Sequence, residues 1–242
     1  MNKNSASNSR FKFDDVFIEV RNLCKYLGIY VDSKLGFQSH IDYIKKRLSK
    51  QCGIICKLRH YIPRKKLIDY YRSNINPLIQ YGILLYGCCS YSSLLPIYKL
   101  QKIFLKFIYF RKLSDSSRDI FISNKLLTVF EFHIYELLKF VLKSLKKMHS
   151  ETYLNELFEY EHSIRNTRRS TKNYLKIPSF KTQFERCSIS YRCAKLFNTL
   201  RKNEVLTQNI ENENWQKISL FYHKFKESYL LNNEELVSYM FK

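Results

Sequence analysis

The fold is decided by one stretch of the sequence, Gln38-Ser-His-Ile-Asp-Tyr-Ile-Lys-Lys-Arg-Leu-Ser-Lys-Gln-Cys-Gly-Ile-Ile-Cys-Lys-Leu-Arg-His-Tyr61. Its apolar side chains recur at steps of three and four residues, the period of an amphipathic α-helix. They are Ile41, Ile44, Leu48, Cys52, Ile55 and Leu58. The opposite side carries Lys46, Lys50 and Lys57. The sequence therefore predicts a helix about 35 Å long with one buried face and one basic face.

Positive charge is concentrated around this helix. The chain of 242 residues has 42 Lys plus Arg against 21 Asp plus Glu, a net charge of +21. Residues 45–72 hold ten basic residues and a single acid, Asp69. Because a merely solvated face normally mixes both signs of charge, this imbalance favours a polyanionic partner, either nucleic acid or an acidic membrane surface.

The basic residues of this region form a candidate binding site. Lys46, Lys50 and Lys57 lie on one helix face, and further basic residues follow at its end and in the next turn, namely Arg59, Arg64, Lys65 and Lys66. This spacing is typical of contacts to successive phosphates along a groove. An ordinary solvated face is the alternative interpretation.

The rest of the chain also favours helices. Only 5 Gly and 4 Pro are present, few for a protein built from many tight turns. A short β-hairpin is predicted from residues 11–20 and 23–31, which bracket Arg21-Asn22. Further helices are predicted after Pro63, with a break at Pro77, over 94–110 with Lys99, Lys102 and Lys106 on one face, and after a capping box at Thr128–Glu131.

The C-terminal half is expected to contain strands near 174–177 and 184–189 and helices over 190–200 and 215–230. We therefore expect a mainly α protein of the α+β class with a small N-terminal β-hairpin. The predicted regions are the hairpin at 1–36, a helical domain at 37–112, and a smaller α+β region at 113–242.

Membrane insertion and secretion are not expected. The charge-free stretch from Ser73 to Tyr98 contains polar residues and two Pro, which interrupt the run of about 20 apolar residues that a bilayer span requires. It is predicted to be a buried helical hairpin. The first ten residues are polar, and the seven Cys show no disulfide framework spacing, so an intracellular protein with reduced thiols is expected.

Two groups of residues are candidates for metal chemistry. Asp14 and Asp15 follow Phe13, and adjacent carboxylates can hold divalent cations, but no upstream strand supplies the further carboxylate. Cys52 and Cys56, with His40 or His60, lack the second close pair of ligands typical of structural zinc. We expect a solvent-facing turn and core thiols instead, with no catalytic residue and no cofactor.

Several short motifs follow one another in a recognisable order. They are Lys25-Tyr-Leu-Gly-Ile-Tyr-Val-Asp32, Leu35-Gly-Phe37 with His40-Ile41, Leu58-Arg-His-Tyr-Ile-Pro63, and Pro77-Leu-Ile-Gln-Tyr-Gly82. Together with the basic helix, this series resembles the stretch just past the active site in reverse transcriptases of non-LTR (LINE, jockey-like) retrotransposons. Lys176-Ile-Pro178 and Arg192-Cys-Ala-Lys-Leu-Phe-Asn-Thr-Leu200 resemble the C-terminal region of that family. The resemblance covers residues 17–200.

The resemblance implies a role for each motif. Lys25, Tyr26, Leu27 and Gly28 would belong to a primer-grip hairpin that supports the primer end. The following helices would form a thumb that holds the primer-template by its backbone, with the three lysines of the helix along the phosphates. The family's aromatic-Ala-Asp-Asp polymerase turn lies many tens of residues before the Lys-Tyr-Leu-Gly string, so Phe13-Asp14-Asp15, which also lacks the Ala, does not match it.

We therefore expect a truncated reverse-transcriptase-like protein that binds nucleic acid and does not polymerise alone. Mg²⁺ would be needed only if another polypeptide supplied a palm and fingers. The alternatives are a basic helical protein on a membrane surface and a decayed, non-functional reading frame.

Overall fold

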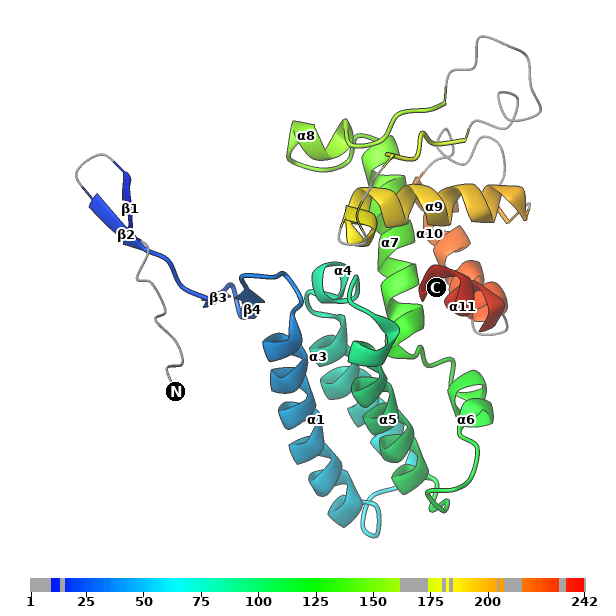
Figure 1. The fold of residues 1–242 in the computed structure, drawn as a ribbon. Helices are drawn as coiled ribbons and strands as arrows, with labels where there is room; N and C mark the ends of the chain where they lie inside the picture. Colours follow the sequence, from blue (N-terminus) through cyan, green and yellow to red (C-terminus); the bar gives the residue numbers. More distant parts are fainter. Residues whose placement is uncertain are drawn as a thin grey trace.

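A computed structural model describes residues 10–13, 16–161, 174–179, 182, 185–203, 205–206, 215–230 and 234–241. These residues are mainly helical, with two antiparallel β-hairpins near the N-terminus (Figure 1), which confirms the predicted α+β class. The elements in chain order are β1 (Arg10–Phe13), β2 (Val16–Glu19), β3 (Leu23–Tyr26), β4 (Ile29–Asp32), α1 (Gln38–Leu58), α2 (Arg64–Tyr70), the π-helical turn η1 (Tyr71–Ile75), α3 (Asn76–Gln80), α4 (Ile83–Tyr86), α5 (Tyr91–Ile108), α6 (Arg118–Ser123), α7 (Val129–Leu145), α8 (Thr152–Asn155), the 3-10 helix η3 (Glu185–Cys187), α9 (Ile189–Lys202), α10 (Trp215–Lys224), the π-helical segment η5 (Phe225–Leu230) and α11 (Glu234–Phe241).

The predicted amphipathic helix forms as α1, which lies beside α5 in the lower bundle (Figure 1). Its apolar stripe is buried, with Ile41, Leu48 and Ile55 at 0% exposure. Burying each aliphatic side chain of this size contributes about 1.5–3 kcal/mol. This stripe fixes the rotation of α1 about its own axis.

The predicted break at Pro77 takes the form of the π-helical turn η1. Pro77 has no N–H to donate to a carbonyl four residues earlier. The N–H of Asn76 bonds to the carbonyl of Tyr71, five residues back, and Pro77 then occupies the first turn of α3.

The charge-free stretch 73–98 packs into the helical core, as predicted. Its buried side chains are Ile75, Ile79, Ile83, Tyr86, Cys88, Leu94 and Ile97. In the part of the chain that the structure describes, no helix has both the length and the apolar character to cross a membrane.

The capping box starts α7 where it is predicted. The Thr128 hydroxyl accepts from the N–H of Glu131 at 3.3 Å, and the Glu131 carboxylate accepts from the N–H of Thr128 at 2.8 Å. Helix α7 runs upward from the bundle, and α9 packs across it (Figure 1). The hydrophobic core is shared along the chain. One cluster of buried side chains contains members of all three predicted regions.

The division into the regions 1–36, 37–112 and 113–242 stays a prediction.

The pairing predicted for the N-terminal strands is wrong. Each predicted strand is itself a hairpin: β1 pairs with β2, and β3 pairs with β4 through a turn at residues 27–28, so the two predicted strands do not pair with each other across Arg21-Asn22. Leu27 and Gly28 have φ of 44° and 83°, the positive values that a two-residue type I′ turn requires. Because leucine is not a residue typical of the first of these positions, the residue types alone do not predict the turn. Asp14 and Asp15 lie outside the described residues.

Three later predictions also need correction. The segment Glu185–Cys187 is a 3-10 helix, and Leu175 forms only a single β-bridge, with Tyr160. The side chain of Asn198 bonds both the N–H and the carbonyl of Leu175, each at 2.8 Å, and so takes the place of a neighbouring strand. Lys106 does not share an outer face with Lys99 and Lys102; it turns inward, and its ammonium donates to the carbonyl of Leu113 at 2.6 Å.

Burial of His133 makes the stability of the fold depend on pH. Its ring is fully buried on α7, with Nδ1 3.1 Å from the carbonyl oxygen of Ile83. Burial, and then the charge of Arg192, lowers the pKa of His133 to about 3. Because the pKa in the unfolded chain is about 6.5, a proton taken up below that pH favours the unfolded chain. We expect the free energy of unfolding to fall between pH 7 and 4, by up to about 1.4 kcal/mol per pH unit from this group, measured by urea denaturation.

His133→Gln is the matched control, since it removes the titrating ring and leaves a side chain that can still donate to the Ile83 carbonyl. His40, whose pKa burial also lowers, remains in both proteins. The variant should lose stability less steeply on acidification. Equal slopes in the two proteins would contradict this account of His133.

Candidate nucleic-acid interface

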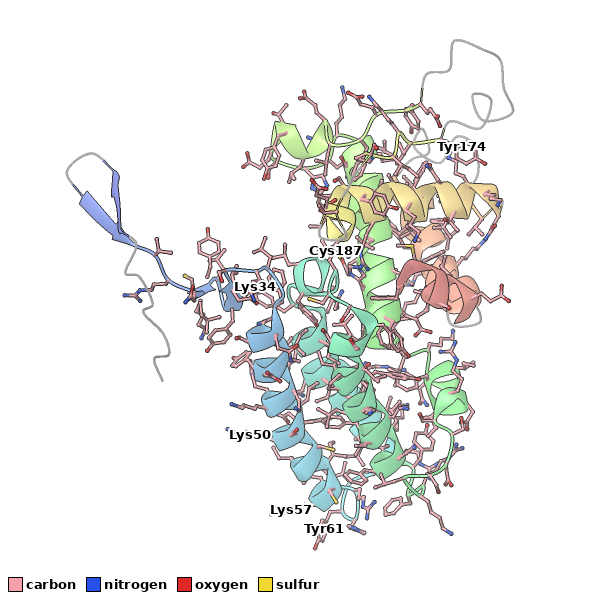
Figure 2. The ribbon with its side chains drawn as sticks, in the orientation of Figure 1. Lys34, Lys50, Lys57, Tyr61, Tyr174 and Cys187 are labelled. Carbon is pink, nitrogen blue, oxygen red and sulfur yellow. The ribbon has the colours of Figure 1, made fainter. Side chains whose placement is uncertain are left out.

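The outer face of α1 carries a row of three lysines, Lys46, Lys50 and Lys57. All three are exposed, and Figure 2 shows Lys50 and Lys57 on the side of α1 that faces away from the other helices. Among the described residues, none of the three has a carboxylate within 4.0 Å. Lys46 and Lys50 are one turn apart, and like charges at this spacing destabilise a helix by about 0.2–0.5 kcal/mol. Only Lys57, in the last turn, is favoured by the helix dipole.

The acids nearest to this row pair with basic residues at its margins. Lys45 lies 4.0 Å from Asp42, and Arg72 lies 3.5 Å from Asp69. The four side chains are about half exposed, so these pairs contribute little to stability. They leave the lysine row itself unneutralised.

A glycine interrupts the row on the same face. Gly53 lies between Lys50 and Lys57, and a Cβ added there would meet no atom within 4 Å. An exposed glycine inside a helix costs about 1 kcal/mol relative to alanine, so neither packing nor helix propensity explains it. The missing side chain leaves open space beside the α1 backbone between the two lysines.

The β3–β4 hairpin extends the basic surface at the N-terminal end of α1. The ammonium of Lys25 lies 5.4 Å from the ring centroid of Tyr30 and 5.8 Å from that of Tyr43. The guanidinium of Arg47 lies 5.7 Å from the same Tyr43 ring and donates to its hydroxyl at 3.2 Å. The two rings therefore join Lys25 to the α1 surface.

The turn of this hairpin is fixed by a segment more than fifty residues away. The Tyr81 hydroxyl donates to the carbonyl of Leu27, and a Cβ on Gly28 would lie 3.6 Å from the Tyr81 ring. Gly82 has φ of +73°, and a Cβ there would lie 2.6 Å from the Cδ1 atom of Ile29. Two of the motifs found in the sequence, Lys-Tyr-Leu-Gly and Pro77–Gly82, thus pack directly on each other.

Aromatic rings accompany the basic side chains at the C-terminal end of α1. The guanidinium of Arg59 lies 4.9 Å from the ring centroid of Phe110, and that of Arg64 lies 4.6 Å from the ring centroid of Tyr109. Lys65 is exposed and lines, with Arg64, a hollow of about 260 Å³.

The predicted site residues are thus only partly brought together. Lys25 joins the α1 surface, whereas Leu27 and Gly28 contact Tyr81, and Tyr26 is exposed beside the turn. Arg59 turns toward the end of α5 and is half-buried.

Sequence reasoning missed Tyr43 and Arg47 as parts of this surface. Tyr43 stands four residues before Arg47, and side chains at this spacing on a helix contact each other. This spacing alone predicts the contact between the two side chains.

A second hollow, of about 810 Å³, lies between the start of α1, α4 and the start of α9. It is lined by Cys88, Cys89 and Cys187, with Lys34 on another wall; Figure 2 labels Lys34 and Cys187. Burial raises the pKa of Cys88 to about 12 and that of Cys89 to about 11. At neutral pH these two thiols are protonated and poor nucleophiles, so the basic surface is the better candidate site.

Comparison of the chain with protein-family models, with curated proteins and with solved structures gives no match.

Two glycine substitutions are expected to have opposite effects on stability. Gly82→Ala forces a Cβ into Ile29 and a positive φ onto alanine, so it should destabilise the protein by about 1–3 kcal/mol. Gly53→Ala meets open space and should stabilise it by up to about 1 kcal/mol. Both changes are measured by chemical denaturation.

Adding Ile29→Val to the Gly82→Ala protein shortens the side chain that clashes with the new Cβ. The double variant should therefore recover part of the stability that Gly82→Ala loses. A neutral Gly82→Ala substitution would contradict the described contact between the hairpin and α4.

Proposed function

We propose that the chain binds the sugar-phosphate backbone of nucleic acid, without reading base sequence, through the outer face of α1. The observation that supports this is the exposed row Lys46, Lys50 and Lys57, which has no carboxylate partner among the described residues. Basic side chains that neutralise phosphates release condensed counterions, and this gives affinity for any sequence. The row spans about 16 Å, roughly the length of five base pairs of duplex.

We further propose that this binding is of the thumb type found in reverse transcriptases of non-LTR retrotransposons. The order of the motifs along the chain favours this type of binding. If the motifs form one functional unit, they should contact each other, and Tyr81 and Gly82 do pack against the hairpin that carries the Leu27-Gly28 turn. In this role α1 and α2 hold the primer-template by its backbone, and the hairpin with Lys25 lies toward the primer end.

The proposal covers binding and contains no polymerisation step. Over the described ranges, no three His, Cys, Asp or Glu side chains are grouped to hold a metal ion, so the described residues do not fit a Mg²⁺ site. A palm and fingers outside the described residues would have to supply it. We also propose an intracellular location, which is supported by all seven cysteines being free thiols.

Neutralising the row should weaken binding and reduce its dependence on salt. For Lys46→Gln, Lys50→Gln and Lys57→Gln combined, we expect the slope of log affinity against log salt on duplex DNA to fall by about 2.5 to 3, because each phosphate contact contributes about 0.9. Fluorescence anisotropy with labelled duplexes of two unrelated sequences, and with an RNA–DNA hybrid, measures this. The same change should appear on every sequence.

A matched control changes the same net charge elsewhere. Lys147, Lys202 and Lys224 are exposed at the end of α7, on α9 and on α10, away from α1 (Figure 1). Replacing these three by Gln should change the slope far less. If both triple variants change the slope equally, the affinity comes from net charge and the proposed surface is wrong.

A further inference from the structure

The turn between α1 and α2 presents an aromatic ring to solvent. Tyr61 is 86% exposed, more than any other large hydrophobic side chain that the structure describes, and Figure 2 shows it at the tip of the bundle, beyond Lys57. Its ring makes no hydrogen bond and no ring contact with a described residue. Burial therefore gives no reason for a tyrosine at this position.

The backbone that carries this ring is held in place. The N–H groups of Tyr61 and Ile62 both donate to the carbonyl of Leu58, each at 3.0 Å. Ile62 packs against the hydrophobic core, and Pro63 fixes the entry into α2. The Tyr61 ring is thus presented from an ordered turn, which lowers the entropy cost of stacking on it.

A second ring lies at the same end of the bundle. Phe110 follows α5, is 55% exposed, and has φ of +53°, a conformation that costs a non-glycine residue about 1 kcal/mol. The N–H of Arg111 closes this turn onto the carbonyl of Lys106 at 2.9 Å, in the position that normally favours glycine. The Arg59 guanidinium, 4.9 Å from the Phe110 centroid, and the His60 ring, at 5.4 Å, pack on Phe110.

The charge around these rings is positive. Lys57 and Lys65 are exposed, and Arg64 stacks on Tyr109 beside the 260 Å³ hollow. The acid on this hollow, Asp69, lies 3.5 Å from Arg72. An occupant must therefore combine negative charge with flat apolar faces, as a nucleic-acid strand with unpaired bases does. Bases inside a duplex have both faces covered, so the site fits an unpaired base.

We infer that the α1–α2 turn is a stacking site for an unpaired nucleobase, with Tyr61 as the platform and Phe110 with Arg59 beside it. The inference rests on the proposed function, because the strand that carries the base lies along the lysine row. It adds that the chain prefers single strands, or duplexes with a single-stranded end, to blunt duplexes.

The test compares a single-stranded oligonucleotide, the same strand with abasic sites, and a blunt duplex. Tyr61→Ala should weaken binding to the single strand by about 5- to 100-fold, with an unchanged salt slope, and leave blunt duplex binding within about twofold. Tyr61→Phe should bind like the natural protein, because the site uses the ring and not the hydroxyl. A 2-aminopurine base in the strand should be quenched by the natural protein and not by Tyr61→Ala.

Three results would overturn the inference. They are equal binding of the abasic and the natural strand, no effect of Tyr61→Ala on the single strand, and a loss on phosphatidylserine vesicles as large as that on nucleic acid. Circular dichroism of Tyr61→Ala checks that the variant is folded, so that a loss of binding does not come from unfolding. A failure of the proposed function is distinguishable, since the natural protein would then bind neither single strand nor duplex with a steep salt slope.

Discussion

The burial of one stripe of α1 against α5 is the constraint on which the rest depends. Ile41, Leu48 and Ile55 are fully buried, and a helix has only one opposite side. Lys46, Lys50 and Lys57 must therefore face solvent together, whatever else the chain does. The repulsion between Lys46 and Lys50 and the exposed glycine between Lys50 and Lys57 both act against the stability of α1. A surface with such costs is more simply explained by a ligand than by the fold, which is the reason that we propose nucleic-acid binding there.

Long-range contacts then extend that surface at both ends. At one end, Tyr81 and Gly82 hold the turn of the β3–β4 hairpin, and Tyr43 holds Lys25 of that hairpin beside α1. At the other end, the close approach of α1 and α5 brings Arg59 onto Phe110. The basic surface is thus assembled from three segments, and the hydrophobic core determines where each of them lies.

The sequence predicts the structure where neighbouring residues determine it, and does not predict contacts between segments that are distant in the chain. The period of α1 and the capping box at Thr128 predict helices that form as expected, because both signals depend on neighbouring residues only. The β3–β4 turn gives no such local signal, because Leu27 stands at a position that usually carries glycine or asparagine. The inward turn of Lys106 and the contact of Arg59 with Phe110 depend on the packing of separate helices, which periodicity does not encode.

The central claim is that the outer face of α1 lies against the nucleic-acid backbone. Lysine acylation followed by mass spectrometry, with and without bound duplex, tests it most directly, because it compares every exposed lysine in one protein. Bound duplex should protect Lys46, Lys50 and Lys57 and leave Lys147, Lys202 and Lys224 as reactive as before. Uniform protection of all six lysines, or protection confined to the second set, would contradict the claim.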